Sequence, residues 1–132
     1  MQPGNALKVL VFGNPYLDID NIALKIADIL RTDKDMLSLR IEFENCYDLR
    51  QVIDQDSFMI LDAVKGIPKP QLIATDELEA GNILSLHDFD LGFFLKLKKE
   101  LGRLDVKIIG VPQEYELKKA IEEVKVLLRE IV

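Results

Sequence analysis

The chain has 132 residues, a length that suits one domain with a buried core of its own. Apolar residues make up 48% of the sequence and charged residues 30%, as in an ordinary globular protein. The formal net charge of -6 argues against non-specific binding to nucleic acid or to an anionic membrane surface. We therefore expect a single domain over residues 1–132, with no nucleic-acid partner.

The first strand and the first helix are predicted from apolar spacing. Leu7–Phe12 is a short apolar run before a Gly-Asn-Pro turn, which is typical of a buried strand. Apolar residues at helical spacing then predict a helix from about Ile19 to Arg31. We expect Asp18 to be its N-cap and Asp20 to lie in its first turn, where the helix dipole favours negative charge.

The middle of the chain predicts further strands. Met36–Glu44 alternates apolar and polar residues, which indicates a half-exposed strand. A short helix is expected at 47–53, and the apolar run Ser57–Val64 predicts a central strand. Pro70–Glu77 suits an edge strand, which tolerates proline at its start. Residues 80–90 are expected to form a loop.

The last third of the chain repeats the alternation of helix and strand. We expect a helix from about Asp88 to Leu101 with Gly102 as its C-cap, then a strand over Asp105–Val111. Tyr115–Ile131 carries apolar residues on one face and predicts an amphipathic helix. This order predicts an α/β fold, a three-layer α/β/α sandwich with a mostly parallel twisted sheet flanked by helices.

The sequence contains one cysteine, Cys46, which cannot form an internal disulfide bond. We expect a buried, inert thiol, and a nucleophile activated by His87 stays open as the alternative. The N-terminus lacks the pattern of a signal peptide, and the apolar run at 7–13 is too short to cross a bilayer. These features predict a cytoplasmic protein without membrane insertion.

Three polar residues are expected at the carboxyl ends of strands, where open α/β sheets bind their ligands. Asp20 follows the first strand, Asp62 lies near the end of the central strand, and His87 precedes the third helix. Two carboxylates and one imidazole make a sensible set for a divalent transition metal. The alternatives are a helix-dipole role for Asp20, a solvated or paired Asp62, and a packed or capping His87.

Common catalytic and nucleotide-binding motifs are absent from the sequence. The Gly-Asn-Pro turn at 13–15 lacks the spaced glycines of a dinucleotide fingerprint, and there is no Walker loop. No serine lies in a Gly-x-Ser-x-Gly elbow. A site for a small anionic ligand is opposed by Asp18 and Asp20, because these acids stand where a phosphate would bind.

Four segments resemble, in order, the signatures of the nickel-iron hydrogenase maturation endopeptidases. That family has the pattern Gly-Asn-x-Leu-x-x-Asp-(Asp or Glu)-Gly-x-Gly after its first strand, which is similar to VFGNPYLDIDNIALKIADIL. MILDAVKG resembles the strand that ends in Asp-Ala, and SLHDFDLGFFLKL resembles the Ser/Thr-x-His segment. VKIIGVPQEYEL resembles the strand that precedes the final helix.

The resemblance implies an endopeptidase that removes the C-terminal extension of the hydrogenase large-subunit precursor after nickel insertion. Carried over by position, it implies that Asp20, Asp62 and His87 contact the nickel of the substrate and carry the catalysis. We expect no tightly bound cofactor, because two acids and one histidine make a weak metal site. We also expect a monomer.

The chain departs from the family pattern at four positions. An ungapped reading places Tyr16 at the leucine, Ile19 at the first acid, and Asn21 and Ala23 at the two glycines. Asn21 is a tolerable substitute where a left-handed backbone is needed. These departures leave open a non-catalytic, chaperone-like module that checks the metal-loaded precursor without cutting it.

Overall fold

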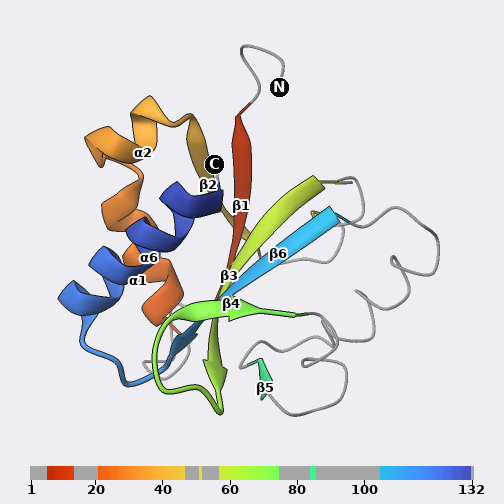
Figure 1. Ribbon diagram of the computed structural model, residues 1–132, viewed down its shortest axis with the longest axis vertical. Helices are drawn as coiled ribbons and strands as arrows, with labels where there is room; N and C mark the ends of the chain where they lie inside the picture. Colours follow the sequence, from red (N-terminus) through yellow and green to blue (C-terminus); the bar gives the residue numbers. More distant parts are fainter. Residues whose placement is uncertain are drawn as a thin grey trace.

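A mixed, mostly parallel β-sheet lies at the centre of the computed structural model (Figure 1). The structure describes residues 6–13, 21–46, 51, 57–74, 84–85 and 105–131. In this part of the chain the strand order is β2-β1-β3-β6-β4, and β5 pairs with the end of β3. The strands are β1 at Leu7–Phe12, β2 at Ile41–Cys46, β3 at Ser57–Lys65, β4 at Gln71–Ile73, β5 at Leu84–Ser85 and β6 at Asp105–Pro112.

The central strands are the apolar runs of the sequence. β1 pairs in parallel with β2 and with β3, and β3 pairs in parallel with β6. The predictions of strands at 7–12, 57–64 and 105–111 are confirmed to within one residue. The edge strand predicted at 70–77 is β4, which is shorter and runs antiparallel to β6. β5 is antiparallel to β3.

Both faces of the sheet are buried. The helices α1 at Ile22–Leu30, α2 at Lys34–Ser38 and α6 at Leu117–Ile131 pack on one face, and their apolar residues join those of the strands in one core (Figure 1). A second core on the opposite face is formed by Leu10, Phe12, Cys46, Phe58, Ile60, Val64, Ile73 and Ile108. The predicted α/β class, with its mostly parallel sheet and flanking helices, is confirmed.

The first helix begins later than the sequence predicts. α1 starts at Ile22 with Asn21 as its N-cap, so the prediction of Asp18 as N-cap is wrong. Asparagine is among the preferred N-cap residues, although the Asn21 side chain makes no capping hydrogen bond here. Asp20 therefore precedes the cap instead of lying in the first turn. Ile22, the first residue of the helix, is buried in the core.

The strand predicted at Met36–Glu44 is also wrong in its first half, because residues 34–38 form α2. Asp33 caps this helix: its Oδ1 accepts hydrogen bonds from the backbone N–H groups of Asp35 at 2.9 Å and Met36 at 3.2 Å. Arg40 then adopts a left-handed backbone with φ of 58°, and β2 begins at the next residue. A strong N-cap thus outweighs the apolar alternation.

The remaining predictions differ in how far the structure tests them. The helix predicted at 115–131 is confirmed as α6. The predicted loop at 80–90 is interrupted by β5 at Leu84–Ser85. Of the helix predicted at 47–53, Gln51 is described and is helical. The helix predicted at 88–101 lies outside the described residues.

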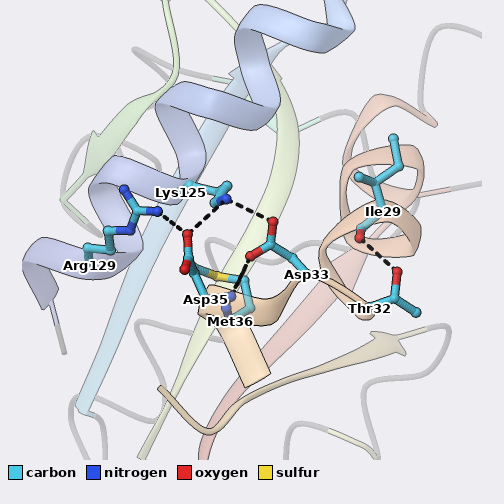
Figure 2. Close-up of polar contacts among 7 residues, drawn as sticks. All are labelled: Ile29, Thr32, Asp33, Asp35, Met36, Lys125 and Arg129. Carbon is cyan, nitrogen blue, oxygen red and sulfur yellow. Dashed lines mark hydrogen bonds and ion pairs between the residues drawn. The ribbon is translucent and has the colours of Figure 1, made fainter. Parts of the chain in front are cut away.

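Ion pairs join α2 to α6 (Figure 2). Lys125 Nζ lies 2.8 Å from Asp33 Oδ2 and 3.2 Å from Asp35 Oδ2, and Arg129 pairs with Asp35. The hydrogen bond from Lys125 lowers the pKa of Asp33 below its ordinary value, and the same bond raises the pKa of Lys125. The cap of α2 is therefore also an attachment point for the C-terminal helix.

Candidate active site

Asp62 is a buried carboxyl group in a central strand. Side chains alternate along β3, so Asp62 shares the face of Ile60 and Val64 in the second core. Its exposed fraction is 1%. Burial of a carboxylate costs stability unless the group is paired or hydrogen-bonded. An aspartate inside an otherwise apolar run is therefore a candidate for a specific interaction or for chemistry.

The sheet places Asp62 near the carboxyl ends of its parallel strands. Asp62 pairs with Gly110 of β6. The preceding residue of β3, Leu61, pairs with Val11 of β1. Asp62 is therefore level with Phe12, the last residue of β1. This is the end of the sheet that the sequence predicts for the site.

Gly110 permits close packing beside Asp62. A Cβ atom added to Gly110 would lie 2.2 Å from Ile73 Cδ1, 2.8 Å from Val64 Cγ2 and 3.3 Å from Ile67 Cδ1. These side chains therefore occupy the space directly over the glycine. Gly110 was not predicted from the sequence as part of the site, although a glycine inside an apolar strand signals a close approach of this kind.

Asp20 and His87 lie outside the described residues, so the structure leaves their predicted roles untested. The described residues around them bear on their position. β1 ends at Phe12, before the segment that leads to Asp20. Ser85 of β5 pairs with Val64, two residues from Asp62 along β3. The segments that lead to Asp20 and to His87 therefore both leave the sheet at the end where Asp62 lies.

Among the described residues, no group of three or more histidine, cysteine, aspartate or glutamate side chains is placed to bind a metal ion, and two of the three predicted ligands are not among these residues. Cys46, the one cysteine of the sequence, lies at the end of β2 and is fully buried, as predicted. Within the same residues, no helix is both long enough and apolar enough to cross a membrane.

The fold and Asp62 together define an α/β domain with a buried acid at the carboxyl end of a central parallel strand. No protein-family model and no curated protein matches this chain. Solved structures do match. The hydrogenase maturating endopeptidase HybD from E. coli superposes with a TM-score of 0.65 at 20% sequence identity, and the match covers 96% of this chain and 93% of HybD.

Two further matching structures are also named as an endopeptidase or a protease. The endopeptidase HycI from Escherichia coli matches with a TM-score of 0.61 and 17% identity over 94% of this chain and 90% of HycI. The [NiFe] hydrogenase maturation protease HycI from Thermococcus kodakarensis matches with a TM-score of 0.54 and 21% identity, covering 96% and 93%. The chain thus has the fold of the hydrogenase maturation endopeptidases, the family that its motifs resemble.

Proposed function

We propose that this protein is an endopeptidase that removes the C-terminal extension of a nickel-iron hydrogenase large-subunit precursor after nickel insertion. The single observation that carries the proposal is the buried Asp62 at the carboxyl end of a central strand. It occupies the Asp-Ala motif that the sequence shares with these enzymes. The fold shared with HybD over 96% of the chain supports the same activity.

The proposed site consists of Asp20, Asp62 and His87, which contact the nickel that the precursor carries. The pairing of Ser85 with Val64 supports the inclusion of His87, because two peptide units span at most about 7 Å. Carboxylate and imidazole groups suit a divalent transition metal and leave positions for the ligands of the substrate. Nickel belongs to the substrate in this proposal, and precursor without nickel lacks the last determinant of recognition.

Two chemical roles are compatible with these residues. Nickel held by thiolates of the precursor can polarise the scissile carbonyl or activate a water molecule. Alternatively, Asp20 or Asp62 acts as the general base that takes a proton from the attacking water. In either case a carboxyl group at position 62 is essential, so the replacement of Asp62 tests the proposal whichever role applies.

The experiment is a cleavage assay on precursor large subunit with and without nickel, followed by intact mass. The Asp62→Asn variant keeps the shape of the side chain and removes its charge. Asp28→Asn is the matched control, because Asp28 is exposed and pairs only with the neighbouring Arg31 in the described structure. We expect nickel-dependent loss of a C-terminal peptide with the wild type and the control, and none with Asp62→Asn.

The second candidate is a checkpoint module that binds the metal-loaded precursor without cutting it. The departures of the sequence from the family pattern support it, and the fold accommodates two of them. Asn21 has φ of -116°, so the position needs no left-handed backbone, and Ala23 is fully buried in the first turn of α1. Ile19 stands where the family pattern has its first acid, and this departure is the remaining support for the alternative. Stable binding of nickel-loaded precursor without any change in mass would favour it.

A further inference from the structure

A groove lies on the molecule between α6 and the turn that leads into β4. Its volume is about 420 Å³. It is lined by Lys69 and Pro70 from the turn and by Glu122, Glu123, Val126, Leu127 and Glu130 from α6. This groove, called the α6 groove below, is on the helix-covered side of the sheet, and Asp62 faces the other side.

Exposed apolar side chains stand in the α6 groove and beside it. Val126 lines the groove and is 49% exposed. Leu72 of β4 is 44% exposed, and it pairs with Ile109, whose side chain belongs to the core under α6. Leu72 is therefore on the same side of the edge strand as the groove. Large apolar side chains gathered on one surface mark a place where another molecule binds.

Two cations of α6 are paired with another element. Lys125 and Arg129 form ion pairs with Asp33 and Asp35 at the start of α2 (Figure 2), and neither lines the groove. The glutamates Glu122, Glu123 and Glu130 line the groove, where Lys69 is the single cation among the lining residues. Glu122 and Glu130 form no ion pair within the described part of the chain. Glu123 accepts a hydrogen bond from the Tyr115 hydroxyl at 2.8 Å. The groove therefore combines the exposed apolar side chain of Val126 with the carboxylates of Glu122 and Glu130.

We propose that the α6 groove binds an extended, basic segment of a partner protein. Glu122 and Glu130 are eight residues apart, which is about 12 Å along a helix, and Val126 lies halfway between them. An extended segment advances about 3.3 Å per residue and points every second side chain to one face. Two basic residues four positions apart thus reach the two glutamates, and an apolar residue midway between them covers Val126.

The chemistry of the groove selects this occupant. Phosphate-bearing molecules are opposed by the three glutamates, because like charges repel. A metal ion cannot be shared by Glu122 and Glu130, since their positions on the helix are about 12 Å apart. The recognised pattern is basic-x-apolar-x-basic. The proposal is independent of the proposed endopeptidase activity, because it involves the opposite side of the sheet.

The test uses the full chain and a fluorescently labelled peptide, Gly-Ser-Lys-Ser-Leu-Ser-Arg-Ser-Gly. A matched peptide carries glutamate at both basic positions. We expect a saturable rise in anisotropy with the basic peptide alone, and an affinity that falls as salt is added. The Glu122→Gln/Glu130→Gln variant should weaken binding about five-fold, since two exposed ion pairs are lost.

The control variant is Glu114→Gln/Glu116→Gln, which removes the same charge from exposed positions outside the groove. It should bind the basic peptide with an affinity within two-fold of the wild type, roughly the effect of screened, distant charges. Equal weakening by both double variants would overturn the proposal, because it would show a general charge effect. Absence of binding by the basic peptide, or equal binding of the two peptides, would overturn it as well.

Discussion

Replacement of Gly110 by alanine tests how tightly the sheet is packed next to Asp62. The added methyl group would lie 2.2 Å from Ile73 Cδ1 and 2.8 Å from Val64 Cγ2. Carbon atoms are in favourable contact at about 3.5–4.0 Å. Ile73 can withdraw its terminal methyl group by rotation. Val64 cannot, because β-branched side chains are stiff at χ1.

The expected cost follows from this geometry. Val64 must move by roughly 0.7 Å to restore an ordinary contact, and Ile73 by more than 1 Å. Overpacking of a well-filled core by one methyl group costs about 1–3 kcal/mol. We expect about 2 kcal/mol for Gly110→Ala, which lowers the melting temperature of a domain of this size by roughly 8 °C.

The assay is urea denaturation of Gly110→Ala, Ile73→Val and the double variant. Ile73→Val removes the Cδ1 atom that the new methyl group meets, at a cost of its own of about 1 kcal/mol. The two costs should not add, and the double variant should be more stable than their sum predicts by at least about 0.5 kcal/mol. A Gly110→Ala variant as stable as the wild type, or strictly additive costs, would refute the packing argument.

Three further predictions concern single side chains. Asp62→Asn should reduce the cleavage rate at least a hundred-fold, roughly the effect of losing a catalytic acid or base. The hydrogen bond from Lys125 lowers the pKa of Asp33. The ionised Asp33 therefore contributes its full stabilisation above its ordinary pKa of 3.8, and this stabilisation is lost as the pH falls through the lowered pKa. The difference in unfolding free energy between the wild type and Lys125→Met should therefore shrink only below about pH 4, as urea titrations across acidic pH will show; a loss that begins near neutrality would contradict it. Cys46 is fully buried, so an aromatic disulfide reagent should react with it in urea but not in the native state. Cys46→Ala should keep the cleavage activity, and a folded but inactive Cys46→Ala variant would restore the nucleophile alternative.

The central strands could be predicted from the sequence because each is an uninterrupted apolar run. β1, β3 and β6 are buried on both faces, and such strands show this pattern directly. The amphipathic stripe of α6 was equally clear. These elements place Asp62 correctly, since its position depends only on the bounds and the neighbours of β3.

The short elements could not be predicted, because local signals compete there. Met36–Glu44 alternates enough to resemble a strand, yet Asp33 caps a helix over residues 34–38, and the ion pairs to Lys125 hold this helix against α6. The start of α1 was misplaced for a related reason. Asp18 and Asn21 are both good caps by residue type, and the structure has Asn21 as the cap, next to Ile22 in the core.

The candidate site was predicted in part. Asp62 lies near the carboxyl end of a central strand, as predicted, and the site roles of Asp20, Asp62 and His87 stay predictions. Gly110 was missed because its importance depends on Ile73, which β4 brings over it from the antiparallel edge of the sheet. A contact between residues 37 positions apart in sequence leaves no local pattern.

The most direct test of the account is the mass of the precursor large subunit after incubation with the protein. The account predicts loss of one C-terminal peptide from nickel-loaded precursor, no loss from precursor without nickel, and no loss with Asp62→Asn. Cleavage that proceeds equally well without nickel, or that survives in Asp62→Asn, would contradict it.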